Sequence, residues 1–108
     1  MLKKLFRYFL NLFKKKGNFR YKIVPDIPKK VELHRIYLVA NEGYVWQAVM
    51  ICPCGCNVKL YINLLEEQRP CWKYSVDAKH NISLYPSIHR KVECKSHFFI
   101  TKGKVVWV

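Results

Sequence analysis

Apolar residues near the N-terminus recur at the three- and four-residue spacing that makes one face of a helix. Within residues 2–16 these positions alternate with lysine and arginine, and they are Leu2, Leu5, Phe6, Phe9, Leu12 and Phe13. Three lysines followed by Gly17 and Asn18 are a typical stop signal. The pattern therefore predicts a basic amphipathic helix over residues 1–17.

The next segment carries breakers of regular structure. Pro25 and Pro28 bracket Asp26 and Ile27, and proline is poorly tolerated inside helices and central strands. We therefore expect a linker over residues 18–30 and a folded domain over residues 31–108.

From residue 31 the pattern changes to short runs rich in branched and aromatic residues, which is typical of strands. Turn signals such as Asn41-Glu42-Gly43 and Lys102-Gly103 separate some of these runs and predict hairpins. The expected strands cover 33–40, 44–52, 57–62, 71–76, 81–85, 97–101 and 104–108. The sequence thus predicts a mainly β fold, a small antiparallel sheet or sandwich.

Size and charge refine this picture. The chain has 108 residues, enough for one domain, and a domain this small gains much from a metal or disulfides. Eight of its 20 Lys and Arg residues lie within residues 1–22, which contain no acidic residue. This asymmetry indicates an anionic partner for the N-terminal segment.

Five cysteines is an odd number for a disulfide framework. The N-terminal apolar residues are interrupted by charges, unlike a secretory signal, and no apolar run approaches the length of a membrane span. We therefore expect a cytoplasmic protein, peripheral to the membrane if its tail binds lipid, whose clustered cysteines are metal ligands.

The strongest chemical signal is a pair of separated ligand clusters. Cys52, Cys54 and Cys56 lie within five residues, and Cys94 and His97 follow later in the chain. Thiolate and imidazole are the ligands that Zn²⁺ prefers, so we predict a zinc-stapled β domain. Two ligand sets are open. The first combines Cys94 and His97 with two of the clustered cysteines, and the second combines all three with Cys94.

No motif of a catalytic site is evident, and no catalytic residue is predicted. Cys71, beside Trp72, is expected in the core. Ser83 and Ser87 flank Pro86 and are expected to satisfy nearby backbone groups. The alternative is that both serines line a recognition surface with Trp72 and Tyr85.

Three partners are considered for residues 1–16. The Phe and Leu face packs on the domain or a second copy, or the helix lies on a membrane as a peripheral contact. Alternatively, the basic residues bind nucleic acid, with strong salt dependence.

Several motifs together resemble a family of small bacterial metal-binding proteins of unknown function. They are Cys52-Pro53-Cys54-Gly55-Cys56, Ser83-Leu84-Tyr85-Pro86-Ser87-Ile88, Cys94-Lys95-Ser96-His97-Phe98 and the closing segment from Gly103 to Trp107. The family has members encoded near bacterial ubiquitin-like conjugation genes. The resemblance covers about residues 30–108 and implies metal ligands among Cys52, Cys54, Cys56, Cys94 and His97. Asn57 stands where the family usually has glycine, which Asn can replace because it tolerates left-handed backbone.

These observations favour a non-enzymatic, zinc-stabilised adaptor that binds a protein partner, as an accessory component of a bacterial ubiquitin-like conjugation or phage-defence system. One alternative is a nucleic-acid-binding zinc protein that uses its basic tail. The other is a zinc- or cysteine-dependent enzyme, for which no general base is evident near the cysteines.

Overall fold

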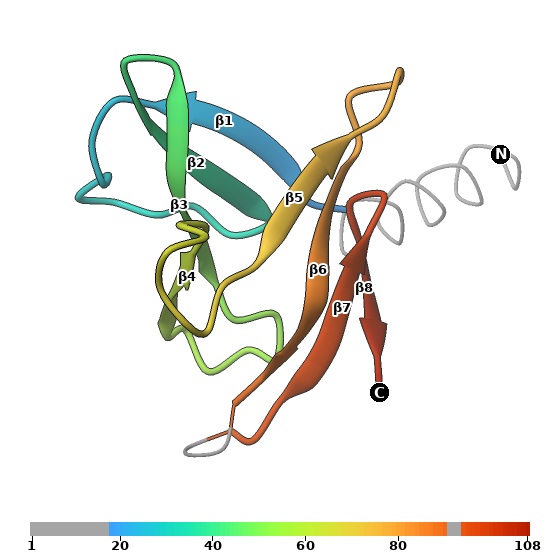
Figure 1. The fold of residues 1–108 in the computed structure, drawn as a ribbon. Coiled ribbons are helices and arrows are strands. Elements are labelled where there is room, and N and C mark those ends of the chain that lie inside the picture. Colours follow the sequence, from blue (N-terminus) through green and yellow to red (C-terminus); the bar gives the residue numbers. More distant parts are fainter. Residues whose placement is uncertain (1–17, 91–93) are drawn as a thin grey trace, which may run out of the picture.

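The computed structural model describes residues 18–90 and 94–108, and every regular element in these ranges is a strand. The strands are β1 (Arg20–Val24), β2 (Arg35–Asn41), β3 (Tyr44–Ile51), β4 (Lys59–Asn63), β5 (Lys73–Val76), β6 (Ile82–His89), β7 (His97–Thr101) and β8 (Lys104–Trp107) (Figure 1). The prediction of a mainly β fold is confirmed. The predicted helix over residues 1–17 lies outside the described residues. Within those residues there is no helix of the length and apolarity needed to cross a membrane.

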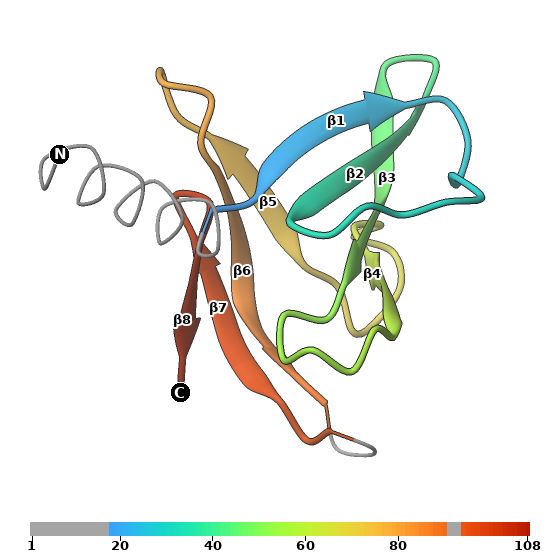
Figure 2. The ribbon, with the colours of Figure 1, turned by 180° about the vertical axis from the view of Figure 1, so that it is seen from behind.

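The strands form two four-stranded sheets, ordered β1-β2-β3-β4 and β5-β6-β7-β8 (Figures 1 and 2). All neighbours are antiparallel except β1 and β2, which are parallel. The prediction of a wholly antiparallel sheet is wrong for this pair, because residues 25–34 carry the chain back to the start of β1 before β2 begins. Residues 20–24 were expected in a linker and instead form β1, while the division into tail, linker and domain stays a prediction.

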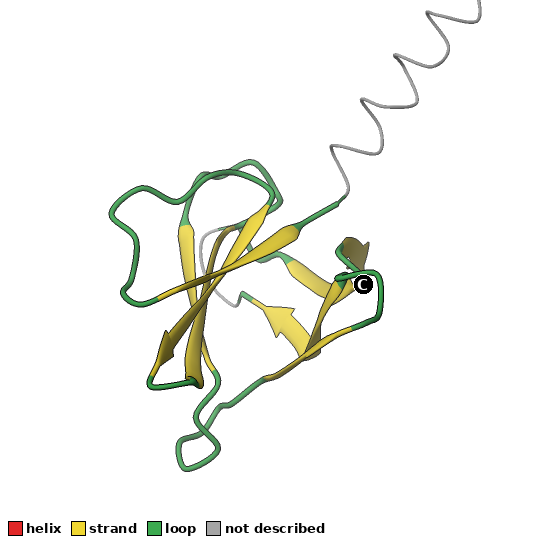
Figure 3. Cartoon of the chain, turned by 90° about the horizontal axis from the view of Figure 1, so that it is seen from above, coloured by secondary structure: helices red, strands yellow, loops and turns green. Residues whose placement is uncertain are grey.

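The main core lies between the two sheets, which face each other in Figure 3. It includes Ile36, Leu38 and Met50 from the first sheet and Leu84 and Phe98 from the second. The alternate residues of β2 point the other way, where they form a smaller buried cluster with β3. Both faces of β2 are therefore buried, as its nearly continuous apolar sequence requires.

Gly103, in the β7–β8 turn, contacts the chain near the first of the described residues. Its N–H donates to the carbonyl of Ile82 at 2.7 Å, and its own carbonyl accepts the N–H of Phe19. Its φ is +78°, and a Cβ atom at this position would lie 2.8 Å from the carbonyl oxygen of Phe19. Both the left-handed backbone and the close approach require glycine here.

Candidate functional site

The three clustered cysteines lie in the loop between β3 and β4, which doubles back on itself. The Cys52 N–H donates to the Val58 carbonyl at 2.9 Å, closing the loop. Gly55 and Asn57 both adopt positive φ, +98° and 62°. Asparagine thus takes the left-handed conformation that glycine would otherwise supply at position 57. This local backbone brings neighbouring thiols to one side of the loop.

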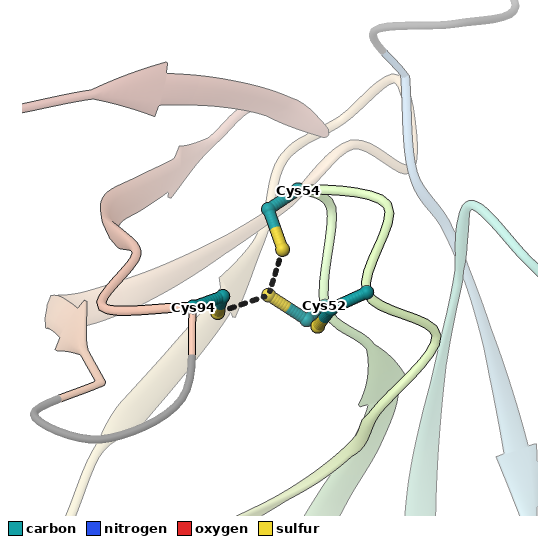
Figure 4. Close-up of side chains that lie close together, drawn as sticks. Cys52, Cys54 and Cys94 are labelled. Carbon is teal, nitrogen blue, oxygen red and sulfur yellow. Dashed lines mark hydrogen bonds between the residues drawn. The ribbon is translucent and has the colours of Figure 1, made fainter.

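Cys94 reaches the same point from the second sheet, just before β7. Its Sγ lies 3.7 Å from Cys52 Sγ, which in turn lies 3.5 Å from Cys54 Sγ (Figure 4). With Cys56 included, the four sulfur atoms all lie within 4.8 Å of one another. Four sulfurs bound tetrahedrally at the usual zinc–sulfur distance would be about 3.8 Å apart. The four cysteines can therefore hold a metal ion.

The thiols of this cluster differ in acidity because their surroundings differ. The hydroxyl of Ser96, followed by its backbone N–H, lowers the pKa of Cys94 to about 6. The same hydroxyl, followed by the Cys56 side chain, lowers the pKa of Cys54. Burial has the opposite effect on Cys52 and raises its pKa to about 11. Cys94 is thus ready to bind a cation at neutral pH, whereas Cys52 must release a proton to do so.

Arg90 adds positive charge beside the sulfurs. Its Nη1 donates to Cys94 Sγ at 3.3 Å and to Cys56 Sγ at 3.5 Å. Its backbone N–H donates to the Ser96 carbonyl at 2.7 Å, which holds the end of β6 against the segment leading into β7. Such outer contacts orient thiolates and offset their combined negative charge.

His97 lies outside this group of four sulfurs. Its Nε2 lies 2.9 Å from Ser87 Oγ, a hydrogen bond between neighbouring strands. The structure therefore brings together the cysteines of the second predicted ligand set and places His97 beside a serine. Which residues bind a metal stays a prediction.

An irregularity in β6 positions Ser87. Leu84 pairs with Ile100 and Ile88 pairs with Phe98, so three residues of β6 lie opposite one residue of β7. Bulges of this kind re-aim side chains and are common beside active sites. The Ser87 carbonyl also accepts the indole N–H of Trp72 at 3.2 Å, which fixes the bulge to the start of β5.

A second histidine, on β6, orients the ring of His97. His89 lies directly opposite it, and the two imidazole rings stack with centroids 4.3 Å apart and an angle of 16° between their planes. The ring of His97 is thus oriented by stacking on one side and by Ser87 at Nε2. Such a pair is the arrangement in which histidine activates a serine hydroxyl.

The other residues singled out in the sequence lie elsewhere. Cys71 is half-buried, separate from the four sulfurs, and accepts a hydrogen bond from Arg69. Ser83 is buried, and its Oγ accepts the Lys102 N–H, as expected for a serine that satisfies backbone. The sequence predicts the same role for Ser87. Its pairing with His97 was missed because nothing in the sequence signals which residues β6 and β7 bring together.

Comparison with known proteins gives one family. The family model of BubE, described as a bacterial ubiquitination-like system serine protease, matches residues 23–108. Searches of curated proteins and of solved structures give no match.

The match corrects the predicted function and agrees with the predicted association. The preference for a non-enzymatic adaptor is wrong, because the family is described as a protease. The association with a bacterial ubiquitin-like system is confirmed, and it indicates protein partners, whereas neither nucleic acid nor membrane gains support. Since the match spans most of the sequence, the chain belongs to the BubE family of bacterial ubiquitination-like system serine proteases.

Proposed function

We propose that this protein hydrolyses a peptide or isopeptide bond in a protein of a bacterial ubiquitination-like system, with Ser87 as nucleophile and His97 as general base. The observation that carries the proposal is the distance of 2.9 Å between Ser87 Oγ and His97 Nε2. This distance is within the range in which histidine can take the proton of a serine hydroxyl.

The remaining serines are poor candidates for the nucleophile. Ser83 is buried, and its hydroxyl is engaged by the Lys102 N–H. Ser96 Oγ lies 3.1 Å from Cys94 Sγ, within the cysteine cluster. Ser75 is exposed on β5 and has no histidine among the side-chain partners found in residues 18–90 and 94–108. Ser87 is therefore the serine best placed for catalysis.

The bonds made and broken involve the two side chains, the substrate and water. His97 Nε2 accepts the hydroxyl proton while Ser87 Oγ attacks the carbonyl carbon of the scissile bond. The imidazolium then gives that proton to the leaving nitrogen, the C–N bond breaks, and an ester remains on Ser87. Water deprotonated by His97 attacks the ester, which releases the carboxylic acid and restores the serine.

The cysteine cluster has a structural part in this proposal. Zinc fits four thiolates at these separations, and a fully ligated zinc ion has no open position for water. When bound, the ion supplies a cross-link between the β3–β4 loop and the segment before β7. Only Lys95 and Ser96 separate Cys94 from His97, so this cross-link would hold the general base in position.

The proposal is tested with a fluorophosphonate probe, which reacts with activated serines. We expect one probe adduct per chain, on Ser87, located by peptide mass spectrometry. Ser87→Ala should lose the adduct. Ser83→Ala, on the same strand, should keep it because that hydroxyl serves only a structural hydrogen bond. Labelling that persists in Ser87→Ala would contradict the proposal.

A second measurement concerns the substrate. The ubiquitin-like protein of the same system, fused at its C-terminus to a small reporter protein, should be cut by the wild-type chain and remain intact with Ser87→Ala. Gel electrophoresis and intact mass would locate the cut. Cleavage by both proteins would assign the activity to another residue.

A further inference from the structure

β5 has an open edge. It is the first strand in the order β5-β6-β7-β8, and all four of its residues are exposed. Within residues 18–90 and 94–108, no strand pairs with the outer side of Lys73–Val76. Directly before β5, the backbone N–H of Trp72 donates to the carbonyl of Asn63, the last residue of β4, at 2.8 Å, so the open edge begins at Lys73. Edge strands of this kind present a row of unpaired N–H and C=O groups to any chain that approaches in an extended conformation.

The beginning of β3 is open in the same way. Tyr44 and Val45 pair with β2 on one side, whereas β4 begins its pairing with β3 only at Gln47. Trp46 is already engaged, because its carbonyl accepts the Leu64 N–H at 3.0 Å. In the described part of the chain, the first two residues of β3 therefore lack a strand partner on their second side.

A groove of about 350 Å³ lies between these two edges. Tyr44 and Val45 line it from β3, Lys73 and Tyr74 line it from β5, and Trp72 lines it from the position directly before β5. Its walls thus combine aromatic surface with two unpaired stretches of backbone. These are the two features by which proteins bind an extended peptide as an added strand.

One residue, Trp72, links the groove to the serine–histidine pair. The Trp72 indole that lines the groove donates its N–H to the Ser87 carbonyl at 3.2 Å. β5 and β6 are antiparallel, with Lys73 opposite Tyr85, so the start of β5 is the end nearer to Ser87. A peptide lying along β5 would therefore have one end close to the nucleophile.

We propose that the groove between β3 and β5 binds the substrate as an extended segment that adds to β5 as a fifth strand. This inference rests on the proposed function and names the form in which the substrate is recognised. An added strand would lie two strand spacings from β6, about 10 Å, which about three extended residues span. The paired segment of the substrate therefore begins about three residues from the bond that is cleaved.

The larger groove of this protein is a poorer candidate for the same substrate. It has a volume of about 620 Å³ and is lined by Arg20, Lys22 and Lys79 among others. Residues 79–81 precede β6, whereas Ser87 lies near the other end of that strand. A substrate held there would not lie against the nucleophile.

The inference is tested with peptides from a bacterial proteome digest. Peptides that the protein cleaves are identified by mass spectrometry, and the one cleaved fastest is resynthesised with a single N-methyl group at each position in turn. In a strand, N–H groups alternate between the two sides. Methylation at every second position, beginning about three residues from the cut, should therefore lower kcat/KM about five- to tenfold. Equal sensitivity at all positions, or none, would overturn the inference.

A pair of variants separates the groove from other surfaces. Tyr74→Ala removes an aromatic wall of the groove and should lower kcat/KM for the same peptide at least fivefold, mainly through KM. Tyr61→Ala, an exposed tyrosine on β4, is the matched control and should behave as wild type. Equal effects of both substitutions would count against binding in this groove.

The outcome also distinguishes the two proposals. If fluorophosphonate does not label Ser87, the proposed function fails. If Ser87 is labelled but no peptide is cleaved, or cleavage is insensitive to both N-methylation and Tyr74→Ala, strand addition to β5 fails while the proposed nucleophile stands.

Discussion

The hydroxyl of Ser87 and the imidazole of His97 meet because the irregular pairing of β6 with β7 brings them within hydrogen-bond distance. Each is half-buried, and His97 stacks on His89 in the opposite register position. Ser83, four residues earlier on the same strand, is buried, and its hydroxyl accepts a backbone hydrogen bond from Lys102. The chemistry of a serine here thus depends on its neighbour across the sheet.

Replacing the general base should separate chemistry from metal binding. His97→Gln should slow labelling of Ser87 by fluorophosphonate at least about 100-fold, since general-base catalysis contributes that much or more. Its zinc content should stay at one ion per chain in elemental analysis, because the four sulfurs form the cluster without His97.

His89→Gln is the control, because it changes the stacked ring but removes no proton acceptor from Ser87. It should slow labelling by less than tenfold. A His97→Gln protein that loses its zinc would instead make His97 a ligand, as in the first predicted set.

At the scale of elements, two turns from different sheets converge on one point. The β3–β4 loop supplies three sulfurs and the segment before β7 supplies the fourth. In protein from which a chelator has removed any metal, the pKa of Cys94 is about 6, below the ordinary value of 9.0. Folding therefore favours the thiolate form of Cys94. Its contribution to stability is complete above pH 9 and declines as the pH falls towards 6.

This predicts a specific pH dependence for the stability of the metal-free protein. The difference in melting temperature between wild type and Cys94→Ser should shrink as the pH is lowered from 9 to 6, because serine does not titrate in this range. Cys52, whose pKa is raised to about 11, loses its contribution only as the pH rises from 9 to 11. Thermal melts at several pH values test this, and a constant difference would contradict it.

Some of these elements could be predicted from the sequence and others could not. The cysteine cluster could be predicted because rare ligand types stand close together in the sequence. The closing hairpin could be predicted because a turn separates two apolar runs. β6 was expected to end at residue 85, since Pro86 normally interrupts a strand, but the bulge accommodates it. Ser87 and His97 are common residue types ten positions apart. Only the pairing of β6 with β7 makes them partners.

Across the whole molecule, one core joins both sheets, and Phe19 belongs to it although it precedes β1. Phe19 is 3% exposed and contacts the His34 ring with centroids 5.6 Å apart. Phe19 lies in the segment predicted as a linker, because Pro25 and Pro28 follow it. Its burial depends on the β7–β8 turn, which lies at the far end of the chain.

Two truncations test the role of Phe19. A chain lacking residues 1–22 loses Phe19 and the first three of the five residues of β1, whereas a chain lacking residues 1–17 keeps all of them. Removing a buried phenylalanine side chain costs about 3–5 kcal/mol. The shorter chain should therefore melt at least about 10 °C below the longer one in calorimetry. Equal melting temperatures would mean that Phe19 and the start of β1 contribute little.

The contact between Gly103 and Phe19 has a consequence for how the protein is made. Phe19 is synthesised early but cannot make this contact until the β7–β8 hairpin has been synthesised. Contacts this distant in sequence form slowly, because a long loop must close first. The first strand of a nascent chain can therefore pair with the second, but Phe19 waits for its partner, and any side chain at position 103 would collide with the Phe19 carbonyl.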